Sequence, residues 1–115
     1  MLKANELRIG NWVLIDELPI KLTESNFFIY LQEDGDFMTR CEGIPITPKI
    51  LVQFGFKRTP TGDFYLSNFK LNTGHHEFRY GDARSTTKVE YVHHLQNLFF
   101  ALYYKELNLV KGPLK

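Results

Sequence analysis

The chain of 115 residues has a single cysteine, Cys41, and no excess of charge of either sign. With 14 Lys and Arg against 13 Asp and Glu, its formal net charge is +1, and both signs are spread over the two halves. One cysteine excludes a disulfide within the chain and suits a reducing compartment. Because no general basic field exists, the charge does not predict tight DNA binding without sequence preference.

Long hydrophobic runs are also missing. The longest extends from Leu98 to Tyr104, far short of the roughly 20 apolar residues of a membrane-spanning helix. Residues 1–6 contain no apolar segment that would form a signal peptide. We therefore expect one cytoplasmic domain over residues 1–115 with no membrane partner, and its length and composition are those of a globular protein.

Motifs of common catalytic and cofactor sites are absent. The glycines stand singly at predicted turns instead of forming a phosphate-binding loop, and no serine lies in a Gly-x-Ser-x-Gly elbow. The four histidines form two adjacent pairs, and adjacent side chains point apart, so each pair offers at most one ligand to a metal. The acidic segment 33–36 lacks the rest of a calcium loop. We predict no metal, no cofactor and no catalytic residue.

Aromatic residues are abundant: ten Phe, six Tyr and one Trp make up 15% of the chain. Each can bury roughly 150–250 Å², and a small domain has few fully buried positions. Some aromatic side chains are therefore expected at the surface, where exposed apolar patches usually mark contacts.

Short apolar segments in the first half predict strands. Both faces of segment 7–15 are apolar, with Trp12 and Leu14 on one and Val13 and Ile15 on the other, so this strand is expected either to be buried on both sides or to curl into a small barrel. Cys41 is expected to be a small core residue. Further strands are expected at 20–23, 27–31 and 37–41, the last two joined by an Asp34-Gly35 hairpin.

The clearest helix signal lies between residues 47 and 56. Thr47 suits the N-cap, and a proline follows at the first helical position. Gly55 suits a left-handed C′ position, after which Phe56 can pack back on Leu51. Two helical turns are unstable alone, so we expect this helix to dock on a sheet.

The second half again predicts strands and then a long helix. The helical period extends from Val92 to Leu107, and because this segment is apolar nearly all round, we expect it to be covered on more than one side. Strands are expected at 64–66, 69–71, 77–80, 87–91 and 107–110, with a bulge or bend near 67–68 and a turn at 72–74. The predicted fold is α+β: a small, bent antiparallel sheet or partly open SH3-like barrel packed with one short and one long helix.

One polar constellation stands out on the long helix. His93, Gln96 and Asn97 share a face at i, i+3 and i+4, and Tyr91 immediately precedes them. An imidazole and two amides offer hydrogen bonds without charge. They form either a recognition face for a peptide, nucleotide or base edge, or, as we favour, a set of groups that satisfies neighbouring backbone inside the fold.

Three segments of the chain resemble a family of small uncharacterised proteins from Bacteroidetes genomes, prophages and phages. The segments are ELRIGNWV at 6–13, IPIT at 44–47 before a helix that ends in FGF at 54–56, and YVHHLQNLFFAL at 91–102. Members often have Gln at the position of His94 and Thr-Gly at those of Tyr103 and Tyr104, so this chain lacks a glycine where the family pattern implies a helix break. The resemblance implies no assigned activity, and only cytoplasmic expression from a mobile element.

These observations favour a non-enzymatic binding module, such as a phage or prophage accessory protein that contacts another protein or a second copy of itself. The first alternative is a small barrel that binds single-stranded nucleic acid. The second alternative is a small enzyme that uses the region of His93. For the nucleic-acid alternative, the candidate stacking residues are Tyr30, Phe64, Tyr65 and Tyr80, and the candidate phosphate contacts are Lys57, Arg58, Arg79 and Arg84.

Overall fold

The computed structural model describes residues 7–25, 41–74, 77–81, 86–112 and 114. The strand predicted at 27–31, the Asp34-Gly35 hairpin and all but Cys41 of the strand predicted at 37–41 lie outside these residues, as do Tyr30 and Arg84. In chain order, the elements are β1 (Trp12–Ile15), β2 (Leu18–Lys21), β3 (Cys41–Glu42), α3 (Pro48–Gln53), β4 (Lys57–Arg58), β5 (Phe64–Leu66), β6 (Phe69–Gly74), β7 (Glu77–Gly81), β8 (Thr86–Lys88) and α4 (Val92–Tyr103).

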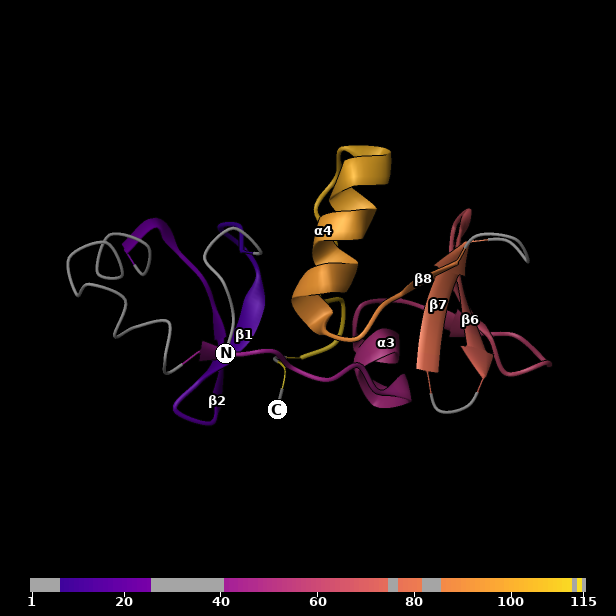
Figure 1. Ribbon diagram of the computed structural model, residues 1–115, viewed down its shortest axis with the longest axis horizontal. Coiled ribbons are helices and arrows are strands. Elements are labelled where there is room, and N and C mark those ends of the chain that lie inside the picture. The colour runs from indigo at the N-terminus through magenta and orange to yellow at the C-terminus, as the bar shows by residue number, and fades with distance from the viewer. Residues whose placement is uncertain (1–6, 26–40, 75–76, 82–85, 113, 115) are drawn as a thin grey trace.

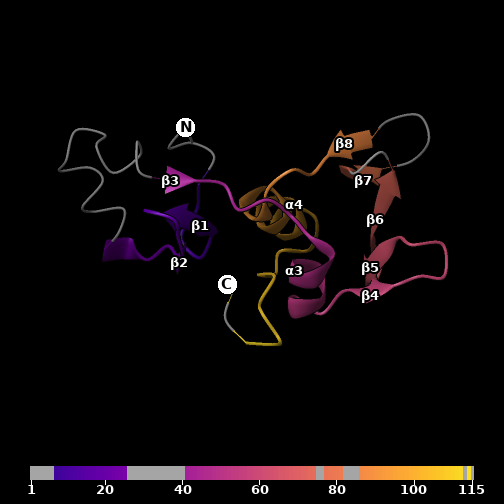
Figure 2. The same ribbon diagram turned by 90° about the horizontal axis from the view of Figure 1, so that it is seen from below.

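The strands form two antiparallel sheets, with the helices between them (Figures 1 and 2). The first sheet has the order β2-β1-β3 and the second the order β4-β5-β6-β7-β8. The predicted α+β class, with one short and one long helix, is confirmed. Over the described residues neither sheet closes into a barrel, and the strands are divided between two open sheets instead of one bent sheet.

A tight hairpin joins β1 and β2. Ile15 pairs with Leu18, and the two intervening residues both have positive φ angles, 50° at Asp16 and 69° at Glu17. This is the pattern of a type I′ turn, whose twist matches that of the strands. Strand β2 therefore begins two residues earlier than predicted. Its proline, Pro19, is tolerated because β2 is an edge strand and need not donate a hydrogen bond there.

Strand β1 separates two apolar clusters, as its two apolar faces predicted. Trp12 and Leu14 pack against the main core of the molecule. Val13 and Ile15 pack on the opposite side in a smaller cluster that contains Cys41. The thiol of Cys41 is fully buried there, which agrees with its predicted place in the core.

Helix α3 follows its local sequence signals closely. The Thr47 hydroxyl caps it by accepting a hydrogen bond from the Ile50 N–H at 3.2 Å. Gly55 has a φ of 95°, which glycine adopts without a Cβ clash, and the Phe56 N–H donates to the Leu51 carbonyl at 3.0 Å. The helix thus begins and ends where predicted and docks its buried side against the main core.

The second sheet specifies one prediction and contradicts another. Leu66 pairs directly with Phe69, so of the bulge or bend predicted near 67–68 the structure has a bend, a two-residue turn with Ser67 at φ 52°. Strand β6 continues through Gly74, so the turn predicted at 72–74 is wrong. Pairing with β7 carries the strand through these three residues, although their Asn-Thr-Gly sequence is typical of a turn.

Helix α4 ends four residues earlier than the hydrophobic period predicted. It spans Val92–Tyr103, and Tyr104 adopts a left-handed conformation with φ 55°. The predicted helical extension to Leu107 and the strand at 107–110 are therefore wrong. Leu107 is nevertheless buried in the main core, because the chain reverses at Tyr104 and brings it back toward the body of the fold. None of the described helices has the length and apolar character needed to cross a membrane.

Phe69 lies at the centre of the aromatic part of the main core. Its ring stacks on Tyr80 with centroids 4.6 Å apart, and it contacts Phe56 from α3's end at 6.0 Å and Phe99 from α4 at 5.5 Å. The second sheet and both helices are thus joined through one buried ring. On its other side α4 contacts β1, so the helix is covered from two sides as predicted.

Candidate functional site

The Gln96 side chain binds the backbone that leads into β1. Its Oε1 accepts a hydrogen bond from the Trp12 N–H at 2.8 Å, and its Nε2 donates to the Gly10 carbonyl at 2.9 Å. The side chain is almost completely buried. Gln96 therefore satisfies two backbone groups that would otherwise lose their hydrogen bonds on burial.

Asn97 completes the same set of contacts. Its Oδ1 accepts from Arg8 Nε at 2.8 Å and from the buried Asn11 Nδ2 at 2.9 Å. The Arg8 guanidinium also pairs with Glu106 at 2.8 Å and lies 4.4 Å above the Phe100 ring. We call Arg8, Asn11, Gln96 and Asn97 the polar clamp, because they tie the segment before β1 to α4.

Tyr91 and His93 belong to a different set of contacts. The fully buried His93 ring stacks on Tyr91 with centroids 5.7 Å apart, and His94 packs against it at 4.3 Å. A Cβ atom at Gly43 would lie 2.6 Å from the Tyr91 ring, so the Gly43 backbone rests directly on that ring. Since the His93 side chain has no exposed surface, a substrate has no direct access to its imidazole.

The four residues singled out in the sequence therefore divide into two pairs. Gln96 and Asn97 face the segment before β1, whereas Tyr91 and His93 stack beneath the segment at Gly43. The sequence favours hydrogen bonds within the fold over a recognition face. The contacts of Gln96 and Asn97 are of this internal kind.

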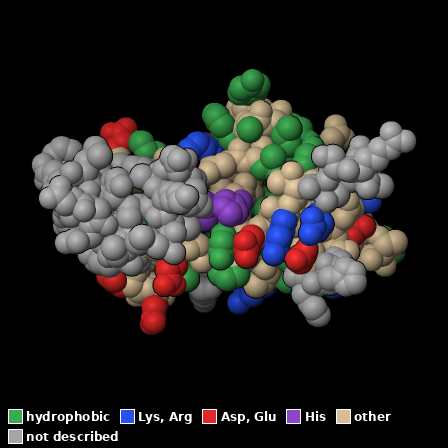
Figure 3. All heavy atoms as spheres, in the orientation of Figure 1, with side chains coloured by type: hydrophobic (Ala, Val, Ile, Leu, Met, Phe, Trp, Pro, Cys, Tyr) green, Lys and Arg blue, Asp and Glu red, His purple; other side chains and the backbone are tan. Residues whose placement is uncertain are grey.

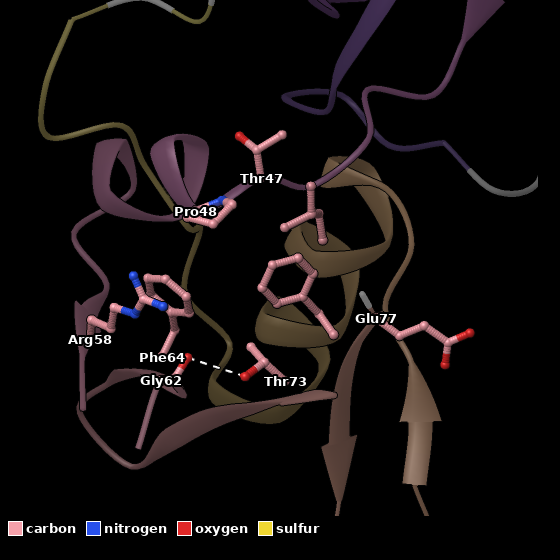
Figure 4. Close-up of a pocket in the computed structure, with 9 residues that line it drawn as sticks. Thr47, Pro48, Arg58, Gly62, Phe64, Thr73 and Glu77 are labelled. Atoms are coloured by element: carbon pink, nitrogen blue, oxygen red, sulfur yellow. Dashed lines mark hydrogen bonds between the residues drawn. The ribbon is translucent and has the colours of Figure 1, made fainter. Parts of the chain in front are cut away.

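A cleft of about 430 Å³ lies elsewhere, between the start of α3 and the second sheet (Figure 4). The strand register places Arg58, Phe64 and Thr73 on the inner face of the sheet, which also carries Phe78. Such a volume is in the range of small-ligand sites, and an apolar lining with a few polar groups is their usual composition. The lining residues are Ile46, Thr47, Pro48, Arg58, Gly62, Phe64, Thr73, Glu77 and Phe78.

Arg58 gives the cleft its positive charge. Its guanidinium lies 5.7 Å from the Phe64 ring centre, and among the described residues no carboxylate is within ion-pair distance of it. Glu77 also lines the cleft, but its carboxylate points away from Arg58 (Figure 4) and binds Arg79 at 2.8 Å and Lys88 at 3.3 Å. The hydrogen bond from Arg79, helped by Lys88, lowers the pKa of Glu77.

The polar groups of the rim are already engaged. The Thr73 hydroxyl donates to the Gly62 carbonyl at 3.2 Å, and the Thr47 hydroxyl caps α3. The Asp63 carboxylate accepts the Thr73 N–H at 2.9 Å, and this hydrogen bond, with the charge of Lys70, lowers the pKa of Asp63. These contacts leave Arg58 as the group best placed to bind a ligand.

Sequence reasoning missed this cleft. Arg58, Phe64 and Tyr80 were candidates for nucleic-acid contacts, but Phe64 is buried and Tyr80 stacks on Phe69. The cleft depends on the register that sets Arg58 opposite Phe64 and on the docking of α3, and neither leaves a local pattern in the sequence.

The end of α4 is a second exposed feature. It projects beyond both sheets (Figure 1), and apolar side chains gather on this projection (Figure 3). Leu102 is 44% exposed and Tyr104 is 82% exposed. Part of the aromatic surplus is thus at the surface, as the composition predicted.

The described part of the chain holds no group of three or more His, Cys, Asp or Glu side chains arranged to bind a metal ion. Comparisons with protein-family models, with curated proteins and with solved structures found no match. Assignment of a function therefore depends on the surfaces described above.

Proposed function

We propose that the chain is a non-enzymatic binding module that recognises another protein through the cleft between α3 and the second sheet. One observation carries this proposal: the cleft combines an apolar floor with the guanidinium of Arg58, which no described carboxylate neutralises. A guanidinium in such surroundings favours a carboxylate, which it can bind with two parallel hydrogen bonds.

The residues that line the cleft indicate which groups a partner would present to it. An apolar side chain of the partner would cover Phe64, Phe78 and Ile46, and an adjacent Asp, Glu or terminal carboxylate would pair with Arg58. The hydroxyls of Thr47 and Thr73 are held by internal hydrogen bonds, and the described residues that line the cleft include no acid–base pair directed into it, which supports binding over catalysis.

The resemblance to proteins of Bacteroidetes phages and prophages suggests a phage or host protein as the partner. We place the interaction in the cytoplasm, where the buried thiol of Cys41 would stay reduced.

A selection from a random peptide library displayed on phage tests the proposal. We expect the wild-type chain to enrich peptides in which an acidic residue lies next to an apolar one. Loss of a hydrogen bond to a charged group costs about 1.5–3 kcal/mol, so Arg58→Gln should weaken binding of the enriched peptides roughly 10- to 150-fold. Lys57→Gln is the matched control, because it removes the same charge from the neighbouring residue on the opposite face.

Two outcomes would contradict the proposal. One is a selection that enriches no peptide. The other is a set of enriched peptides that bind Arg58→Gln as tightly as wild type. Because the Arg58 side chain is exposed and makes no described hydrogen bond or ion pair, the variant should fold normally, and its circular dichroism spectrum and melting temperature check this.

A further inference from the structure

The outer face of the second sheet, which points away from the cleft, carries a row of basic residues around a tyrosine. In the strand register, Lys57 of β4 lies opposite Tyr65 of β5, and Tyr65 lies opposite Lys70 of β6. Arg79 of β7 lies opposite Lys88 of β8 on the same face. We call these five residues the basic face.

The tyrosine of this row is open to solvent. Tyr65 is 37% exposed, and no described aromatic ring packs against it. The lysines on either side are exposed as well. Neighbouring strands are about 4.8 Å apart, so the ring lies between two ammonium groups that can reach past it on both sides.

The basic face keeps a positive charge although the chain as a whole is nearly neutral. Among the described residues, two carboxylates contact its four cations. Glu77 pairs with Arg79 and Lys88, and Asp63 is 3.8 Å from Lys70. Basic and acidic side chains lie next to one another over β7 and β8 (Figure 3). Lys57 pairs with no described carboxylate, and the Asp63 carboxylate is held mainly by the Thr73 N–H.

We propose that the basic face binds single-stranded nucleic acid. A base stacks on the Tyr65 ring while the adjacent phosphates contact Lys57 and Lys70. An unpaired base is required, because only then is its face free to stack on a side chain. The structure thereby revises the residues predicted for this function: Tyr65, Lys57 and Arg79 share this face, Lys70 and Lys88 join them, and Phe64, Tyr80 and Arg58 belong to the other side.

The site is distinct from the proposed protein-binding cleft, because the two use opposite faces of one sheet and share only Glu77, which lines the cleft and pairs with Arg79 and Lys88. A protein partner in the cleft and a strand of nucleic acid on the basic face can be bound together. Failure of either proposal leaves the other standing.

Fluorescence anisotropy of a labelled short oligothymidylate, and of the matching oligouridylate, tests the inference. If two or three cations contact phosphates, affinity should fall about 25- to 125-fold between roughly 20 and 200 mM salt. Loss of one stacked base should make Tyr65→Ala about 5- to 150-fold weaker, and Tyr65→Phe, which keeps the ring, should bind nearly as wild type. Tyr104→Ala removes a more exposed tyrosine at the end of α4 and should change nothing.

Glu77 provides a test in the opposite direction. Its carboxylate competes with phosphates for Arg79 and Lys88, so Glu77→Gln should bind the oligonucleotide several-fold more tightly. A structural role alone would not strengthen binding. The proposal is overturned if no oligonucleotide binds at about 20 mM salt. It is also overturned if Tyr65→Ala binds as wild type, or if inorganic polyphosphate binds as tightly as the oligonucleotide, since that would show attraction by charge without stacking.

Discussion

Replacing Gln96 by leucine should destabilise the protein strongly, although no ligand contact is lost. Leucine is similar in size but cannot replace the hydrogen bonds to the Trp12 N–H and the Gly10 carbonyl, at 2.8 and 2.9 Å. Leaving a buried backbone group without a partner costs about 1–3 kcal/mol. Two such groups, less a partial gain from the more apolar side chain, give about 2–4 kcal/mol.

That loss is large against the roughly 5–15 kcal/mol that stabilises a typical domain. At about 4 °C per kcal/mol for a chain of this size, the melting temperature should fall by roughly 8–16 °C. Chemical denaturation with tryptophan fluorescence gives the free energy of unfolding directly, since Trp12 is the only tryptophan. Native-state hydrogen exchange should also show faster exchange at the Trp12 amide.

Asn108→Ala is the control, because it removes an exposed amide that makes one long internal hydrogen bond of 3.4 Å. It should change stability by less than about 0.5 kcal/mol. If Gln96→Leu unfolds at the same denaturant concentration as Asn108→Ala, the polar clamp does not stabilise the fold. Gln96 and Asn97 would then have to be reconsidered as ligand-binding residues.

Three further predictions concern single positions. Gly43→Ala places a methyl group 2.6 Å from the Tyr91 ring, and the resulting overpacking should cost about 1–3 kcal/mol in thermal unfolding. Tyr104→Gly should instead stabilise the protein by about 0.5–1 kcal/mol. Glycine relieves the left-handed conformation at φ 55°, and this gain exceeds the loss of a ring that is 82% exposed and meets Phe100 edge-on at 6.4 Å; a melting temperature below wild type would contradict this. The pKa of Asp63 is lowered in the folded protein by the Thr73 N–H, so its contribution to stability is complete above the unfolded value of 3.8 and is lost as pH falls below that. Asp63→Asn should therefore flatten the decline in unfolding free energy below about pH 4, and an unchanged slope would show that the hydrogen bond gives no such coupling.

Local signals predicted α3 well and the end of α4 poorly. Everything that sets α3, from the cap at Thr47 to the contact at Phe56, lies within ten residues of sequence. At the end of α4 the apolar period continues to Leu107, but Leu107 reaches the core after a chain reversal and not as part of a helix. A hydrophobic residue in helical register thus indicates burial, and burial alone does not fix the path of the chain.

The features that the sequence did not predict depend on contacts between residues far apart in the chain. The division into two sheets depends on pairing between Ile15 and Cys41 and on the position of α4 between the sheets. For Gln96 and Asn97, a role inside the fold was the favoured prediction, because two amides on an apolar helix need hydrogen-bond partners. Their partners, which are Gly10 and Trp12 for Gln96 and Arg8 and Asn11 for Asn97, are 84 to 89 residues away, so no pattern in the helix sequence identifies them.

The polar clamp also constrains the order in which the chain can acquire its structure. Its hydrogen bonds join residues separated by 84 to 89 positions, and the ion pair between Arg8 and Glu106 spans 98. During synthesis, β1 emerges from the ribosome long before α4 exists to receive it. The first sheet therefore keeps one apolar face uncovered until α4 has been synthesised. Folding should be completed only after translation has passed residue 106.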